Sequence, residues 1–173
     1  MRNIEIKAIL RDADSVKINA KKLSGCEPTV LKQVDTFYFV PNGYLKLRVL
    51  SDNYGELIHY QRPKDEGPKL SNYTKISFTD KSALEAIDKI LTDANGRVGV
   101  VEKTRLLYLV GQSRIHIDNV LNLGNYMEIE VVLEDHQDTK VGEEIANDLM
   151  SKLGINKDDL LANAYIDMLL QKP

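Results

Sequence analysis

Two segments in the second half of the chain alternate strictly between apolar and ionisable side chains. In residues 113–118 an arginine, a histidine and an aspartate fall on one parity, and two isoleucines fall on the other. In residues 127–131 two glutamates share one parity between apolar neighbours. Because successive side chains of a β-strand point to opposite faces, each segment has one apolar face and one ionisable face. The ionisable positions are Arg114, His116, Asp118, Glu128 and Glu130.

The same alternation recurs along the chain, and this recurrence points to a site rather than to isolated solvated edges. It predicts eight strands, over residues 2–10, 30–39, 44–49, 56–62, 71–78, 98–110, 113–118 and 127–133. Apolar residues at helical spacing predict four helices, over residues 12–23, 80–94, 138–153 and 157–170. Turn signals such as Pro41-Asn42-Gly43 join neighbouring strands as hairpins, which indicates an antiparallel sheet. We therefore predict an α+β fold in one domain spanning residues 1–173, an eight-stranded antiparallel β-barrel with the helices packed outside.

The composition limits the classes of function. A net charge of −3 and a pI near 5.7 argue against a general nucleic-acid-binding protein. Cys26 is the only cysteine, so the chain has neither a disulfide framework nor a cysteine metal site. No apolar run approaches the roughly 20 residues of a membrane span, and the first ten residues lack the apolar stretch of a signal peptide. We expect a cytoplasmic protein that binds neither nucleic acid nor a membrane, and the sequence leaves its oligomeric state open.

The ionisable faces together carry more basic than acidic side chains. Since an isolated charge is costly to bury, a barrel lined by these groups must contain a wet, charged channel. A phosphate chain would neutralise the excess positive charge, because Arg and Lys donate charge-assisted hydrogen bonds to phosphate oxygens. The carboxylates suit Mg²⁺ or Mn²⁺, and the two together suit metal-dependent phosphoryl transfer. In the empty channel we expect Arg48 to stand among other cations, where like-charge repulsion costs stability.

Short motifs in a fixed order extend over nearly the whole chain. They are Asn3-Ile4-Glu5-Ile6-Lys7, Asp35-Thr36-Phe37-Tyr38-Phe39, Leu45-Lys46-Leu47-Arg48, Tyr60-Gln61-Arg62-Pro63, Lys103-Thr104-Arg105, Arg114-Ile115-His116-Ile117-Asp118, Gly124, Glu128-Ile129-Glu130 and, in the C-terminal region, Tyr165. With these motifs the chain resembles the CYTH superfamily, also called the triphosphate tunnel metalloenzymes, which includes class IV adenylyl cyclases and thiamine and inorganic triphosphatases. One position departs from the family pattern, because Asn3 stands where the first glutamate of an E-x-E-x-K strand is expected.

The resemblance implies a barrel-shaped tunnel with a triphosphate-containing small molecule lying along it. By the same resemblance, Lys7 is the catalytic residue that assists the water or the leaving group. Metal-dependent hydrolysis of an inorganic or organic triphosphate is the leading prediction. The alternatives are a class IV-type adenylyl cyclase that makes cyclic AMP from ATP, and a non-catalytic polyphosphate- or nucleotide-binding module. The implied phosphate-binding residues are Lys46, Arg48, Arg62, Lys103, Arg105 and Arg114, and the implied ligands of one or two Mg²⁺ or Mn²⁺ ions are Glu5, Asp118, Glu128 and Glu130.

Three further residues have roles that the pattern alone does not decide. His116 lies on an ionisable face without a Cys or Ser partner, so we expect a hydrogen-bonding role rather than an acid/base role. Tyr165 either caps the tunnel mouth or packs the last helix against the barrel. The strand register leaves open whether Lys75 faces the tunnel.

Overall fold

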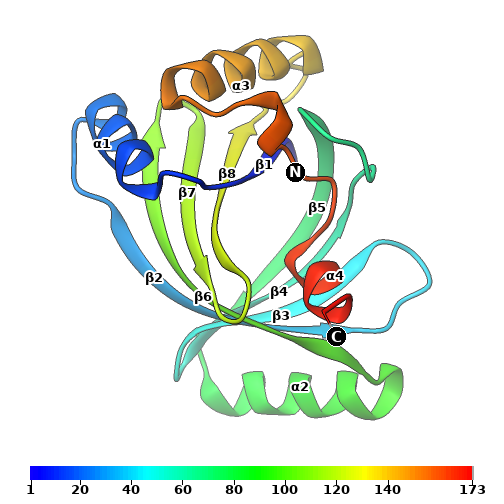
Figure 1. The fold of residues 1–173 in the computed structure, drawn as a ribbon. Coiled ribbons are helices and arrows are strands. Elements are labelled where there is room, and N and C mark those ends of the chain that lie inside the picture. The colour runs from blue at the N-terminus through cyan, green and yellow to red at the C-terminus, as the bar shows by residue number, and fades with distance from the viewer. Residues whose placement is uncertain (173) are drawn as a thin grey trace.

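The computed structural model describes residues 1–172, and its centre is a closed barrel of eight antiparallel strands (Figure 1). The strands follow the order β1-β5-β4-β3-β2-β6-β7-β8, and the last pairs with the first. The predicted α+β barrel is therefore confirmed. The strands are β1 (Arg2–Ile9), β2 (Thr29–Tyr38), β3 (Tyr44–Ser51), β4 (Tyr54–Gln61), β5 (Lys69–Phe78), β6 (Arg97–Val110), β7 (Ser113–Val120) and β8 (Gly124–Val132).

Three helices begin and end at residues with strong capping preferences. Each of α1 (Ala13–Ser24), α2 (Lys81–Asn95) and α3 (Thr139–Leu153) follows an aspartate whose carboxylate accepts a backbone N–H of the first turn. α1 and α3 end at Gly25 and Gly154, which adopt the left-handed conformation that favours glycine. The helices predicted for these regions are confirmed. Within residues 1–172, no helix is both long enough and apolar enough to cross a membrane.

The strands turn their apolar faces outwards, beneath the helices. On β1, Ile4, Ile6 and Ala8 are fully buried and belong to a core cluster that includes residues of α1 and α3. Figure 1 shows these two helices on one side of the barrel and α2 on the opposite side. Burying an aliphatic side chain stabilises the fold by about 1.5–3 kcal/mol. Because this core lies outside the barrel wall, the interior remains available to polar side chains.

The contact between α3 and β1 is close enough to require a glycine. A Cβ placed on Gly142 would lie 2.6 Å from the side chain of Ile4 and 2.7 Å from that of Leu133. A glycine inside a helix costs about 1 kcal/mol relative to alanine, and the close packing of α3 on the barrel offsets that cost.

The helix predicted over residues 157–170 is wrong in its first half. The structure has a short 3₁₀ turn, η1 (Lys157–Asp159), and then an extended segment before α4 (Tyr165–Leu170). Leu160 forms a β-bridge with β1, and the N–H of Leu161 donates to a β1 carbonyl at 2.9 Å. These bonds to the barrel override the local helical spacing, which is only a weak preference.

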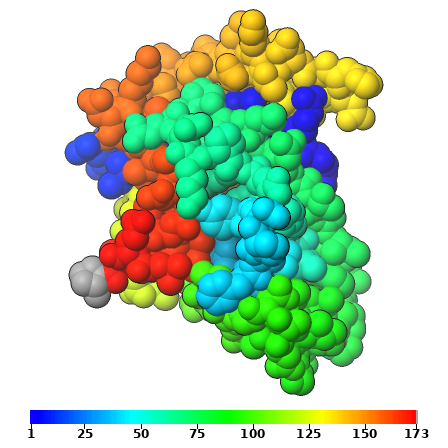
Figure 2. Space-filling model, turned by 90° about the vertical axis from the view of Figure 1, so that its right-hand side faces the viewer, coloured from blue at the N-terminus to red at the C-terminus, as the bar shows by residue number. Residues whose placement is uncertain are grey.

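The C-terminal segment lies over one side of the barrel. Figure 2 shows it, in orange to red, beside the cyan region that includes β3. The hydroxyl of Tyr44 on β3 donates to the carboxylate of Asp167 on α4 at 2.6 Å. The segment therefore brings its side chains, among them Tyr165, onto the barrel wall.

Candidate functional site

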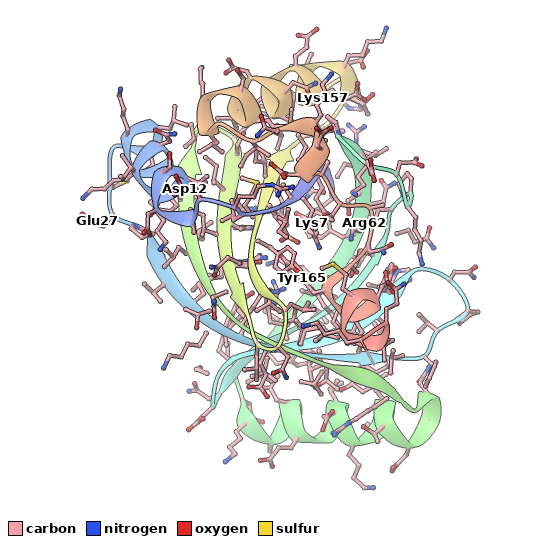
Figure 3. All side chains as sticks on the ribbon, in the orientation of Figure 1. Lys7, Asp12, Glu27, Arg62, Lys157 and Tyr165 are labelled. Carbon is pink, nitrogen blue, oxygen red and sulfur yellow. The ribbon has the colours of Figure 1, made fainter. Side chains whose placement is uncertain are left out.

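A cavity of about 320 Å³ lies inside the barrel, and nearly all of the predicted site residues line it. Figure 3 shows Lys7, Arg62 and Tyr165 towards the middle of the ring of strands, whereas Glu27 lies outside it. Of the eleven predicted site residues, the exception is Asp118. The ten that line the cavity are Glu5, Lys7, Lys46, Arg48, Arg62, Lys103, Arg105, Arg114, Glu128 and Glu130.

The charges around the cavity do not cancel. Eight lysine and arginine side chains line it together with five carboxylates, which leaves a formal charge of +3. Enclosed excess charge is unfavourable unless a counter-charge accompanies it. The arrangement therefore suits a polyanion, and the excess of positive charge expected from the strand faces is present in the structure.

Three of the predicted phosphate-binding side chains gather on one carboxylate, that of Asp35. Its Oδ1 accepts a hydrogen bond from Arg48 Nε at 2.7 Å. Its Oδ2 lies 2.9 Å from Lys46 Nζ and 3.4 Å from Lys103 Nζ. Burial would raise the pKa of Asp35, but the charges of these three cations outweigh burial and hold the pKa well below its usual range. One carboxylate thus pairs with three basic side chains, and this excess of basic groups remains for a ligand.

The expectation that Arg48 stands unpaired among other cations is therefore wrong. Its guanidinium donates two hydrogen bonds to Asp35, at 2.7 and 2.8 Å. The sequence held a signal for this partner, because Asp35 shares its parity with Gln33 and Phe37, which also line the cavity. In the observed register Asp35 lies directly opposite Arg48. Strand parity predicts the face of a residue, but its cross-strand partner depends on the register of the sheet.

Lys46 combines deep burial with a nearby like charge. Burial, followed by the charge of Arg48, lowers the pKa of Lys46 to about 7, because Asp35 only partly opposes these two causes. Near neutral pH this side chain is therefore divided between its charged and neutral forms. An anion bound beside it would favour the charged form.

Two rows of ionisable side chains cross strands β7, β8 and β1. In one row Glu130 lies between Arg114 and Glu5, and in the other Glu128 lies between His116 and Lys7. Direct cross-strand neighbours have Cβ atoms about 4.5–5.5 Å apart, so their side chains interact. Arg114 lies 2.8 Å from Glu130, and Lys7 lies 2.9 Å from Glu128. Each of the two glutamates thus forms an ion pair with a basic neighbour.

Glu5 pairs with Arg62. It lies opposite Glu130 in the register, where two carboxylates repel each other. Its Oε1 instead accepts a hydrogen bond from Arg62 at 2.6 Å. Asn3 precedes Glu5 on the same face of β1, is buried, and has an amide oxygen without a hydrogen-bond partner among residues 1–172.

Asp118 is fully buried and is not among the residues that line the cavity. It accepts two hydrogen bonds from Arg105, at 2.7 and 2.6 Å, and one from the hydroxyl of Tyr165 at 3.0 Å. Arg105 also donates to Glu128 at 2.6 Å. Burial would raise the pKa of Asp118, and the charge of Arg105 overcomes burial and lowers it. The geometry makes Asp118 the anchor of Arg105, and its role as a metal ligand stays a prediction.

Tyr165 lines the cavity and also packs α4 against the barrel in a core cluster, so its position is compatible with both of the roles left open for it. Its ring is buried, and the ammonium of Lys7 lies 3.9 Å from the ring centroid. An ammonium over an aromatic ring is attracted to the negative face of the ring. The C-terminal segment therefore helps to hold Lys7 inside the barrel.

Three groups that can bind a metal ion meet on β7 and β8. One ligand atom from each of His116, Glu128 and Glu130 lies within 4.8 Å of the other two. The Nδ1 atom of His116 is 3.6 Å from Glu128 and 3.9 Å from Glu130. These distances are too long for hydrogen bonds, and the buried Nδ1 has no partner among the described residues. The hydrogen-bonding role expected for His116 is thus absent at this nitrogen, and the three groups fit a divalent cation.

Several cavity residues were not predicted from the sequence. Glu56 faces the cavity and lies 2.5 Å from Lys75, so the register question for Lys75 is decided in favour of the cavity. Tyr60 and Tyr73 also line the cavity. The parity of Glu56 with Arg62 on one strand was a usable signal for its orientation.

A closed antiparallel barrel around a charged interior defines the class of triphosphate tunnel proteins. The CYTH domain family matches residues 1–165, and the chain belongs to that family. In general, CYTH proteins bind triphosphate substrates and depend on metal ions.

Relatives and solved structures agree with this assignment. A Methanocaldococcus jannaschii protein provisionally named adenylate cyclase is 27% identical over 178 residues, covering 97% of this chain and 98% of that protein. The PH1819 protein of Pyrococcus horikoshii has the same fold, with a TM-score of 0.80 at 20% identity over 99% of both chains. A Hippeastrum protein provisionally called an adenylyl cyclase, and said to have a dominant triphosphatase activity, has a TM-score of 0.62 at 16% identity. That match covers 97% of this chain and 94% of the other.

Proposed function

We propose that this protein is a metal-dependent triphosphatase that hydrolyses an inorganic or organic triphosphate inside the barrel. The observation that carries the proposal is the division of the cavity lining into two parts. Three basic side chains surround Asp35 with a net positive charge, and two glutamates and an imidazole lie on β7 and β8. The first part suits phosphate oxygens and the second suits a divalent cation.

In this proposal the basic side chains bind and orient the phosphate chain. Lys46, Arg48 and Lys103 exchange part of their contact with Asp35 for phosphate oxygens. Lys7, placed between Glu128 and the ring of Tyr165, donates a proton or a hydrogen bond to the leaving group. A divalent cation bound by Glu128 and Glu130 would neutralise phosphate charge. Phosphoryl transfer depends mainly on such positioning and charge neutralisation.

Similarity to the Hippeastrum protein supports the triphosphatase, and the name of the Methanocaldococcus relative supports a class IV-type adenylyl cyclase as the second candidate. Both activities would use the same triphosphate site. They differ in the attacking group, which is water in the triphosphatase and the ribose 3′-hydroxyl in the cyclase.

The test is incubation with tripolyphosphate, thiamine triphosphate or ATP, each with Mg²⁺ or Mn²⁺, while released phosphate and cyclic AMP are both measured. The triphosphatase predicts metal-dependent phosphate release. Glu130→Gln should reduce this release by roughly 100-fold or more, since even outer partners of a metal ligand contribute 10–100-fold. Glu102→Gln, the same substitution on the exposed face of β6, is the matched control and should keep wild-type activity.

Each of the other outcomes contradicts the proposal in a different way. Cyclic AMP as the main product would identify a cyclase. Tight binding of all three compounds without turnover would identify a binding module.

A further inference from the structure

We propose that His116 is a nitrogen ligand of the divalent cation held by Glu128 and Glu130. We further propose that a bound polyphosphate frees these two glutamates from their basic neighbours, so that they can bind the cation. The inference rests on the proposed function, because it concerns the metal of the same tunnel. It adds the identity of a metal ligand, a preference among cations and a positive coupling between phosphate binding and metal binding.

The Nδ1 nitrogen of His116 has no hydrogen-bond partner among the described residues. The side chain is only 4% exposed, and its Nδ1 faces the two glutamates without a hydrogen bond to either. A buried polar atom left without a partner destabilises the folded state. Native structures keep few such atoms, and a missing ion is one of the ordinary explanations. A cation between His116, Glu128 and Glu130 would give Nδ1 a partner for its lone pair.

The sheet register supplies the second argument. His116 lies directly opposite Glu128 on the neighbouring strand, and Glu130 is the diagonal neighbour two residues further on. All three side chains point into the barrel from two paired strands, so the backbone fixes their separation. Metal ligands on strands are held more rigidly than ligands on loops. The trio therefore needs only side-chain adjustments to close around an ion.

The ligand types determine which cation is preferred. Mg²⁺ takes oxygen ligands in a near-ideal octahedron and rarely accepts a nitrogen. Imidazole suits Mn²⁺ less than it suits later transition metals, but a mixed set of nitrogen and oxygen favours any of these over Mg²⁺. We therefore expect Mn²⁺ to bind more tightly than Mg²⁺.

The basic neighbours of the glutamates compete with the metal. Lys7 and Arg105 both contact Glu128, at 2.9 and 2.6 Å, and Arg114 contacts Glu130 at 2.8 Å. A cation approaching these carboxylates must displace positive charges of the protein. A polyphosphate offers the same basic groups another anion, which frees the glutamates. Phosphate and metal binding are then positively coupled, and the coupling is the same in either order of addition.

The experiment measures Mn²⁺ by pulsed electron paramagnetic resonance, which detects modulation by a ¹⁴N nucleus bound to the ion. The polyphosphate is a methylene-bridged tripolyphosphate analogue that resists hydrolysis and contains no nitrogen. Its Mn²⁺ complex in solution therefore gives no ¹⁴N signal. Wild-type protein with the analogue should show imidazole modulation and should bind Mn²⁺ more tightly than protein without it.

Two variants make the assignment specific. His116→Gln should lose the ¹⁴N modulation and bind Mn²⁺ roughly tenfold or more weakly, and its advantage for Mn²⁺ over Mg²⁺ should fall. His136→Asn is the matched control, because His136 is exposed and its positive φ of 69° is tolerated by asparagine. This control should behave as wild type. A rise in melting temperature of His116→Gln with the analogue alone would show that the variant is folded and binds phosphate.

The outcomes separate this inference from the proposed function. Bound Mn²⁺ without ¹⁴N modulation, or modulation that persists in His116→Gln, overturns the role of His116 and leaves the triphosphatase intact. Equal Mn²⁺ affinity with and without the analogue overturns the coupling. A protein that binds the analogue but never Mn²⁺ contradicts both this inference and the metal dependence of the proposed function.

Discussion

Replacing Asp35 by asparagine tests whether this carboxylate stabilises the fold by compensating the positive charges inside the barrel. In the free protein the Asp35 carboxylate is 1% exposed and pairs with Lys46, Arg48 and Lys103. Asparagine keeps the shape but loses the charge, and its amide nitrogen cannot accept a hydrogen bond from the Arg48 guanidinium. Three neighbouring cations are then left without their counter-charge.

The expected loss is large. Removing one partner of a buried ion pair costs about 3–5 kcal/mol, because the remaining charge stays buried without compensation. For a chain of this size each kcal/mol lowers the melting temperature by about 2–4 °C, so Asp35→Asn should melt about 6–20 °C lower. Tripolyphosphate should restore most of the loss, since it brings negative charge to the same three cations. The rise in melting temperature on adding tripolyphosphate should therefore be larger in the variant than in wild type.

The assay is thermal unfolding of wild type, Asp35→Asn and the control Asp52→Asn, with and without tripolyphosphate and without metal. Asp52 is exposed in a turn, so its loss of charge should have little effect. A melting temperature of Asp35→Asn close to that of wild type would refute the pairing. A large drop that tripolyphosphate does not restore would show that the anion binds elsewhere.

The lowered pKa of Asp35 also predicts how the stability of the protein changes at low pH. The pKa of Asp35 in the folded protein lies below its value in the unfolded chain, near 3.9. Its stabilisation is therefore complete above that pH and is lost as the pH falls towards the folded-state pKa. Below about pH 4 the stability of Asp35→Asn should fall less steeply than that of wild type. If the stabilities of wild type and Asp35→Asn fell equally steeply below pH 4, the lowered pKa of Asp35 would be contradicted.

Three further predictions concern other residues of the cavity. Lys46, with a pKa of about 7, should lose its charge as the pH rises from 6 to 8.5, so tripolyphosphate affinity measured by titration should fall over this range. Lys46→Arg should remove that component of the pH dependence, and an unchanged profile in this variant would count against Lys46. Tyr165→Phe removes the hydroxyl that donates to Asp118, and urea unfolding should show a loss of about 1.5–3 kcal/mol, as expected for a hydrogen bond to a charged group. Asn3→Glu should tighten Mn²⁺ binding without phosphate, and equal affinity in calorimetric titration would place Asn3 outside the metal site.

The sequence by itself determined which face of each strand points into the barrel. Side chains alternate at a period of two, so one ionisable parity on β1, β7 and β8 was enough to place Glu5, Lys7, Glu128 and Glu130 inside. Eight strands, most of them joined by short turns, are enough to close into a barrel, and this closure was predicted. For the same reason the excess of positive charge in the cavity could be predicted before any contact was known.

The tertiary structure alone decided which charges meet. Parity does not specify register or side-chain rotamer, so the pairing of Asp35 with three cations and the open nitrogen of His116 could not be predicted. Asp118 shares the ionisable parity, yet it is buried in hydrogen bonds with Arg105 and Tyr165 and does not line the cavity. Tyr165 itself reaches the cavity because bonds to β1 keep the preceding segment extended where helical spacing predicted a helix. Contacts between residues distant in the sequence add energies that no local pattern contains, and in this barrel they set the partner of each charge.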